Sequence, residues 1–191
     1  MTFNFLSTAI KLMLFEHQIT DMRISLIGMA GVGKSTIGKA LARRIGCQFI
    51  DVDRLIIADK GMKLQELIDR YGDNALIEIE EKAVISLNID NDCVISPGGS
   101  VVYSEKAMKY LKEKTTIVFL DSPFKIIEER MRNPSGRGVI GLKKYTINEI
   151  FEQRYKLYQK YADITVKIDK ASRINEIVNK ILNETSKEDK T

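Results

Sequence analysis

The sequence is poor in the residue types that many enzymes use for chemistry: it has one histidine, two cysteines and no tryptophan among 191 residues. His17 lies upstream of the first predicted strand, so histidine general-base chemistry and histidine metal sites are excluded from the domain that follows. Acid–base work must then fall to Asp, Glu, Lys or water. Cys47 and Cys93 form no metal or redox motif, and we expect two core thiols in a reducing cytoplasm.

Strong charge and long apolar runs are also lacking. The net charge is +4, from 30 basic and 26 acidic residues, which is too small to indicate a nucleic acid or a membrane surface as partner. No apolar run is long enough to cross a bilayer. The length suits one domain with a sizeable core, and together with the two cysteines it leads us to expect a single domain in the cytoplasm.

The two ends of the chain differ from its body. Residues 1–21 are moderately apolar, but Lys11 interrupts them and no signal-peptide cleavage site stands out. Two interpretations stay open: Met22 is the true translation start, which we favour, or the segment is a short extra helix packed on the body. The polar tail, residues 185–191, is expected to fray.

The most informative segment is residues 28–35, GMAGVGKS, which match the phosphate-loop pattern G-x-x-x-x-G-K-[ST] in full. The apolar run before it predicts a buried strand, and the periodicity after it predicts a helix. The glycines let the backbone wrap a phosphate, and the helix adds its positive dipole end. Lys34 would reach the β- and γ-phosphates, and the Ser35 hydroxyl would bind magnesium. We therefore expect ATP and Mg²⁺ as ligands, with nucleotide contacts from Gly31, Val32, Gly33, Lys34, Ser35 and Thr36.

From residue 22 to residue 184 short apolar runs alternate with helical periodicity, which is typical of an α/β domain. Strands are predicted at 23–27, 48–52, 93–96, 116–120 and 164–168. Helices are predicted at 36–45, 63–71, 74–89, 104–113, 123–132, 146–161 and 172–184. This order indicates a five-stranded parallel sheet covered by helices on both faces, with ligands bound at the carboxyl ends of the strands.

Residues 133–144, NPSGRGVIGLKK, break the periodicity, because Pro134 and three glycines disfavour a steady helix. The segment could be a plain surface loop. We favour a mobile lid that closes over the phosphates, with Arg137 reaching inward.

Together these segments resemble the shikimate kinases, small phosphate-loop phosphotransferases related to the nucleoside monophosphate kinases, over about residues 23–168. The resemblance implies a three-layer P-loop kinase fold with a short lid. It also implies an enzyme of aromatic amino acid biosynthesis, often a monomer, that transfers the γ-phosphate of ATP to a hydroxyl of shikimate.

The resemblance assigns roles to the residues of the acceptor side. Asp51 and Asp53 match the family's D-x-D pair: Asp51 would help hold magnesium through water, and Asp53 would bind acceptor hydroxyls unless it merely caps the next helix. Gly98 and Gly99 match a glycine triplet that lets the acceptor lie against bare backbone. Arg154 matches an arginine that reaches the acceptor, although a salt-bridged helix surface would give the same pattern.

Two further arginines are assigned to the nucleotide. Arg130 matches one that packs on adenine, although an exposed, idle arginine fits the pattern nearly as well. Arg137 matches the lid arginine that contacts the transferring phosphate, but Gly138 follows it where the family usually has proline. The implied catalytic residues are Lys34, Asp53 and Arg137.

Two departures affect the acceptor side. Ile77 stands where the family has the arginine that grips the shikimate carboxylate, and Ser100 replaces the third glycine. Losing one partner of a desolvated charge pair costs about 2–5 kcal/mol, or roughly thirty- to several-thousandfold in affinity, unless Arg70 or Arg154 compensates. Glu78 and Glu80 also oppose a carboxylate.

Other functions stay open for these reasons. A kinase of the same fold could act on a hydroxylated acceptor without a carboxylate, or the chain could be a non-catalytic ATP-binding regulator. A nucleoside monophosphate kinase would need more arginines around its acceptor.

Overall fold

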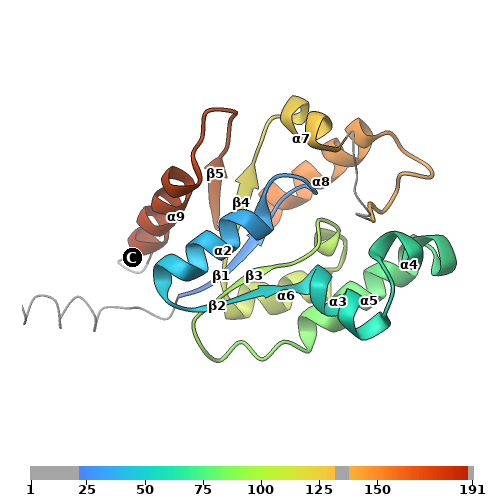
Figure 1. The fold of residues 1–191 in the computed structure, drawn as a ribbon, viewed down its shortest axis with the longest axis horizontal. Helices are drawn as coiled ribbons and strands as arrows, with labels where there is room; N and C mark the ends of the chain where they lie inside the picture. The colour runs from blue at the N-terminus through green and yellow to red at the C-terminus, as the bar shows by residue number, and fades with distance from the viewer. Residues whose placement is uncertain (1–21, 132–137, 189–191) are drawn as a thin grey trace, which may run out of the picture.

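The computed structural model describes residues 22–131 and 138–188. Its centre is a five-stranded parallel sheet with the strand order β2-β3-β1-β4-β5 (Figure 1). The strands are β1 (Arg23–Ile27), β2 (Gln48–Asp51), β3 (Cys93–Ser96), β4 (Thr116–Asp121) and β5 (Ile164–Lys167). All five predicted strands are therefore confirmed, with ends that differ by at most one residue.

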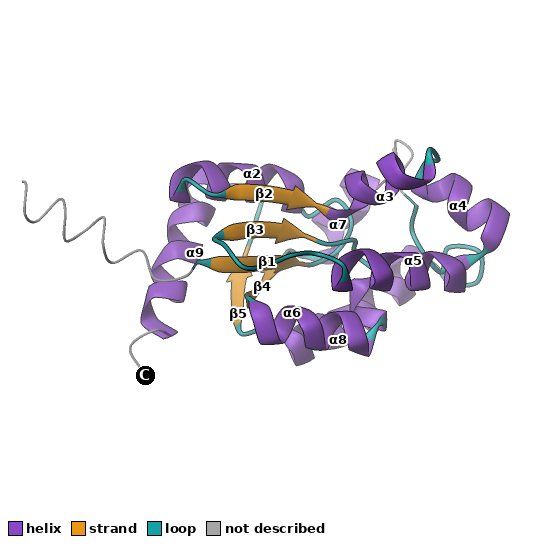
Figure 2. Cartoon of the chain, turned by 90° about the horizontal axis from the view of Figure 1, so that it is seen from below, coloured by secondary structure: helices purple, strands orange, loops and turns teal. Residues whose placement is uncertain are grey.

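Helices cover both faces of the sheet, as predicted. Helices α2 (Lys34–Ile45) and α9 (Ile174–Glu188) pack together on one face, and α6 (Glu105–Lys114) and α8 (Ile147–Tyr161) contact β4 from the other, with α7 (Phe124–Met131) beside α8 (Figures 1 and 2). The strands between these layers are apolar, and Leu26, Val94 and Val118 are fully buried. Burial on both faces explains why the strands read as continuous apolar runs.

Three helices lie beyond the carboxyl ends of β2 and β3: α3 (Val52–Lys60), α4 (Leu64–Tyr71) and α5 (Asp73–Ile85) (Figure 2). Helix α3 was not predicted from the sequence. It follows β2 without a connecting turn, and it buries only Val52 and Ile56, so its apolar pattern is short. Its N-cap is Asp51, whose side chain accepts a hydrogen bond from the Arg54 amide at 3.3 Å.

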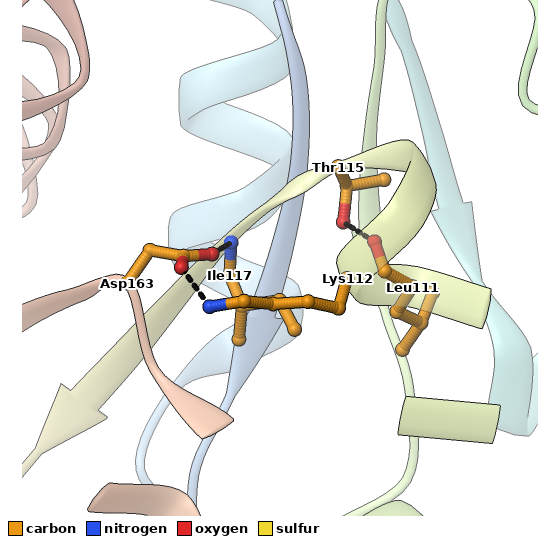
Figure 3. A network of polar contacts seen from close by, with 5 residues as sticks. All are labelled: Leu111, Lys112, Thr115, Ile117 and Asp163. Carbon is orange, nitrogen blue, oxygen red and sulfur yellow. Dashed lines mark hydrogen bonds and ion pairs between the residues drawn. The ribbon is translucent and has the colours of Figure 1, made fainter. Parts of the chain in front are cut away.

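The opposite end of the sheet is fixed by polar contacts of Asp163, at the start of β5 (Figure 3). One carboxylate oxygen of Asp163 accepts from the Ile117 amide at 2.9 Å, and the other pairs with Lys112. Nearby, the Thr115 hydroxyl donates to Leu111 O at 2.8 Å, where α6 ends. These contacts align β4 and β5 and leave the carboxyl end of the sheet for a site.

Two helix ends deviate from the predictions by more than two residues. Helix α5 ends at Ile85 rather than at residue 89, because Ser86 caps it and its hydroxyl donates to Ala83 O at 2.9 Å. Helix α9 runs to Glu188, past the predicted end at 184, and buries Thr185. Within the described ranges, no helix is long and apolar enough to span a membrane.

Candidate active site

The phosphate loop connects β1 to α2, and its conformation depends on glycine. Gly28 has a φ of 142°, and a Cβ at this position would lie 2.9 Å from Leu120 O, so only glycine fits beside β4. Gly31 and Gly33 also have positive φ, at 84° and 111°. Gly33 is the N-cap of α2, which places the amino end of that helix at the loop.

Two cations hold the loop. Lys34 is buried, and its ammonium group donates to Gly28 O at 2.8 Å and to Met29 O at 3.2 Å. Arg130, on α7, donates from Nη1 to Gly31 O and to Val32 O, both at 3.1 Å. Arg130 is therefore engaged with the loop rather than idle. Both cations bind carbonyl oxygens of the loop, so they hold its backbone in place and add positive charge beside it.

A cleft of about 670 Å³ opens at the carboxyl end of the sheet. It brings together every predicted ligand-contact residue that lies in the described ranges: Gly31, Val32, Gly33, Lys34, Ser35, Thr36, Asp51, Asp53, Gly98, Gly99, Arg130 and Arg154. Arg137 lies outside the described residues. The cleft therefore joins the loop that suits phosphates to the residues assigned to the acceptor.

The donor set suits magnesium. Ser35 and Asp51 line the same cleft and supply a hydroxyl and a carboxylate oxygen. Among the described residues, no group of three or more His, Cys, Asp or Glu side chains could hold a metal ion alone. Magnesium prefers one or two protein oxygens plus water and substrate phosphates, so a sparse donor set beside a phosphate loop fits it.

Two carboxylates converge on the backbone of Gly98. A Cβ at Gly98 would lie 2.5 Å from Glu80 Oε1 and 2.9 Å from Asp53 Oδ1. Asp53 lies in the first turn of α3, where Asp51 provides the side-chain cap, so capping does not explain Asp53. An acceptor hydroxyl placed against Gly98 would meet carboxylate oxygens that can orient it and accept its proton.

The opposite wall of this part of the cleft carries Arg154, on α8. Arg154 is 1% exposed; Nη2 donates to Ile140 O at 3.0 Å, and Nε donates to the Tyr103 hydroxyl at 3.3 Å. Its guanidinium also lies over the Tyr103 ring, 5.2 Å from the centroid. Tyr158, one turn along α8, donates its hydroxyl to Gly99 O at 2.6 Å. Arg154 and Tyr158 are thus buried site residues, not a salt-bridged helix surface.

Glu80 and Ser100 were not among the predicted site residues, yet both are buried and line the cleft. The Ser100 hydroxyl lies 2.8 Å from Glu80 Oε1 and 2.6 Å from Oε2. Burial, followed by the charge of Asp53, raises the pKa of Glu80 to about 7. Sequence signals existed for both: Glu80 keeps the final glutamate of the family pattern, and Ser100 is the altered third glycine.

No side chain of α4 replaces the arginine that the family has where this chain has Ile77. Arg70 lies exposed on α4 with its guanidinium 5.4 Å from the Tyr71 ring centroid, and it does not line the cleft. Glu78 is exposed and also lies outside the cleft lining. Of the two arginines that could compensate for Ile77, only Arg154 lines the cleft.

The described part of the predicted lid, residues 138–144, packs on the body. A Cβ at Gly138 would come within 2.8 Å of Leu64 C, which explains why this chain has glycine where the family usually has proline. The Gly141 amide donates to Asp73 Oδ2 at 3.1 Å, and Lys143 pairs with Asp69 at 3.3 Å. The segment therefore contacts α4 and α5, and it also contacts Arg154 through Ile140 O. Its opening and closing stay a prediction.

Comparisons with known proteins identify the family of this chain. The family model for shikimate kinase matches residues 30–186. A shikimate kinase from Persephonella marina is 32% identical over 159 residues, covering 83% of this chain and 96% of that protein. The shikimate kinase from Aquifex aeolicus is 34% identical over 161 residues, covering 84% of this chain and 94% of that protein.

Solved structures give the same result. The crystal structure of the Aquifex aeolicus enzyme has a TM-score of 0.72 and covers 86% of this chain and 96% of its own, at 34% identity. A shikimate kinase from Acinetobacter baumannii, solved in complex with shikimate, has a TM-score of 0.80 and covers 87% of this chain and 94% of its own; at 22% identity it supports the fold alone. The matched family model and these relatives show that the chain belongs to the shikimate kinase family.

Proposed function

We propose that this protein is an ATP-dependent kinase that transfers the γ-phosphoryl group of ATP to a hydroxyl of shikimate. The observation that carries the proposal is the single cleft, which joins a complete phosphate loop to Asp53 and Arg154. Family membership supports the same reaction.

Each side chain has a role that follows from its position. Lys34 and the loop hold the phosphates, and Ser35 and Asp51 would hold magnesium, which when bound neutralises charge on the phosphoryl oxygens. Asp53 orients the acceptor hydroxyl and accepts its proton as the new bond forms. Arg154 binds the acceptor carboxylate, and Arg130 steadies the loop from its carbonyl side. In-line placement and charge neutralisation then supply the rate enhancement.

The direct test is a coupled ADP-release assay with ATP, magnesium and shikimate. We expect magnesium-dependent ADP release, with one phosphoryl group transferred to shikimate per ADP as seen by ³¹P NMR. Chelation of magnesium provides the control. Absence of turnover at millimolar shikimate, in a preparation that binds Mg-ATP, would overturn shikimate as the acceptor.

A second acceptor class is favoured by one observation: the acceptor side holds Glu80 and Asp53 but lacks a cation from α5. The methyl ester of shikimate keeps all hydroxyls and loses the charge, so it discriminates the two classes. If shikimate is the substrate, the ester should have the higher KM, because Arg154 loses its ionic partner. A lower KM for the ester would favour an uncharged acceptor.

We expect the protein to be a monomer, which light scattering can check.

A further inference from the structure

Glu80 and Ser100 make two close oxygen–oxygen contacts. The Ser100 oxygen is within hydrogen-bond distance of both carboxyl oxygens of Glu80, at 2.8 and 2.6 Å. A hydroxyl carries one hydrogen, which it can donate to one carboxyl oxygen or share between the two. If the Glu80 carboxyl carries a proton, it can donate that proton back to the Ser100 oxygen, so that each of the two contacts has its own hydrogen. The geometry therefore accommodates a neutral carboxyl group paired with an alcohol, and the surroundings of Glu80 decide whether that state is favoured.

The surroundings of Glu80 favour that state. Glu80 is 3% exposed, and the Asp53 carboxylate from α3 faces it across Gly98. Lys34 on α2 and Arg154 on α8 supply positive charge nearby, and the Tyr158 hydroxyl on α8 is neutral because burial raises its pKa. Helix α4 lines the cleft with the apolar Leu64. Burial and Asp53 outweigh the cations and the Ser100 hydrogen bond, and they raise the pKa of Glu80 to about 7.

Ile77 lies one turn before Glu80, on the same face of α5, because residues three apart on a helix are neighbours. Ile77 is partly buried against the core and brings no charge. Glu80 therefore has no cation on its own helix face to neutralise it. In this chain a serine from the β3 loop contacts it instead.

We propose that Glu80 and Ser100 form a specificity pair, in which a proton shared between them neutralises the Glu80 carboxyl in place of a cation on α5. The inference rests on the proposed function of the cleft. With the proton present, the acceptor side can take an anionic alcohol on Arg154. When the proton leaves, a second carboxylate beside Asp53 repels the anion. Affinity for a carboxylate-bearing acceptor therefore falls as the pH rises through neutrality.

The test is the KM for shikimate between pH 6 and pH 8, at saturating Mg-ATP, for the wild-type protein and for Glu80→Gln. Glutamine reproduces the neutral pair, because its amide donates to Ser100 and its carbonyl accepts. For a group with a pKa of about 7 the protonated fraction falls roughly tenfold over this range, so we expect a rise of about tenfold in wild-type KM. In Glu80→Gln we expect a KM that stays within about twofold of the wild-type value at pH 6.

Glu78→Gln is the matched control, because it removes an exposed carboxylate from the same helix. Glu78→Gln should show the same rise in the KM for shikimate with pH as the wild-type protein. A Glu80→Gln variant that also keeps the full rise would overturn the specificity pair. Because ATP itself titrates in this range, the difference between the two variants, rather than either profile alone, decides the result.

A second measurement separates this inference from the proposed function. In protein labelled with ¹³C at the glutamate carboxyl, the signal missing from Glu80→Gln identifies Glu80. Its titration midpoint in the free protein should lie near pH 7. A midpoint near 4.5, the ordinary glutamate value, would overturn the pair even if shikimate is phosphorylated. A midpoint near 7 without shikimate turnover would uphold the neutral pair and refute the acceptor.

Discussion

The two halves of the cleft are built in different ways. The phosphate half is one continuous segment, residues 28–35, in which the Lys34 ammonium reaches back six residues to Gly28 O, and Arg130 joins it from α7. The acceptor half is assembled from α3, α5, the loop after β3, and α8, and its contacts join residues far apart in sequence, such as Arg154 and Tyr103. A site formed by one segment keeps or loses its sequence pattern as a whole. A site formed by several elements can change its residues on one element while the other elements stay the same.

This difference explains where the chain departs from its family. The phosphate loop matches its pattern at every fixed position, because each glycine and the lysine are required by the same backbone path. On the acceptor side Ile77 and Ser100 are both altered, and both lie next to Glu80. A buried carboxyl must be paired or neutral, and in this chain, which has no cation at position 77, Glu80 is paired with the Ser100 hydroxyl.

The largest effect on activity is expected from Lys34→Met, which changes the phosphate half of the cleft. Methionine keeps the length and removes the charge that neutralises the transferring phosphoryl oxygens. Removal of one such oriented donor costs about a hundred- to thousandfold in kcat. The measurement is kcat in the ADP-release assay, with Mg-ATP affinity by calorimetry.

Lys39→Met is the matched control, because Lys39 is an exposed lysine on the same helix. It should retain wild-type kcat. Since the Lys34 ammonium also ties two loop carbonyls, the melting temperature of Lys34→Met is measured in parallel. A folded Lys34→Met that keeps more than about a tenth of wild-type kcat would contradict the role given to this lysine.

The acceptor half of the cleft can be tested by placing a cation at position 77 with Ile77→Arg. A guanidinium beside Glu80 would neutralise it at every pH and add a second ligand for a carboxylate. At the lower end of about 2–5 kcal/mol for a desolvated charge pair, the KM for shikimate should fall about thirtyfold at pH 8. Its pH dependence should flatten, while the KM for ATP should not change.

Ile77→Met controls for the loss of the branched side chain, which packs partly against the core. Ile77→Met should leave the KM for shikimate and the KM for ATP within about twofold of the wild-type values. It should lower the free energy of unfolding by about 1 kcal/mol. An Ile77→Arg protein that melts like Ile77→Met but binds shikimate no better would show that position 77 does not reach the acceptor.

The sequence predicts the sheet and the phosphate half well, because strands such as residues 116–120 are uninterrupted apolar runs and the loop is a continuous pattern. It does not predict α3, whose two buried residues are too few for a periodic signal. It also misses the pairing of Glu80 with Ser100, since that contact spans twenty residues of sequence and depends on how α5 meets the β3 loop. The sequence leaves open whether Arg70 or Arg154 compensates for Ile77, whereas in the structure only Arg154 of the two lines the cleft.

The smallest effect is expected from Tyr103→Phe, which tests how finely Arg154 is positioned. The ring stays under the guanidinium, 5.2 Å from its centroid, so the cation–π contact is kept. Only the hydrogen bond from Nε to the hydroxyl is lost, and at 3.3 Å it is long. A loss of about 0.5–1 kcal/mol corresponds to a two- to fivefold rise in the KM for shikimate, with the KM for ATP unchanged.

Tyr110→Phe separates positioning from general destabilisation. Tyr110, on α6, donates its hydroxyl to Leu87 O at 2.5 Å and does not line the cleft. Both variants should lose a similar amount of stability, since each removes one partly buried hydroxyl hydrogen bond. Only Tyr103→Phe should alter the shikimate KM. Equal KM values in the two variants would mean that Ile140 O and the packing of α8 alone hold Arg154 in place.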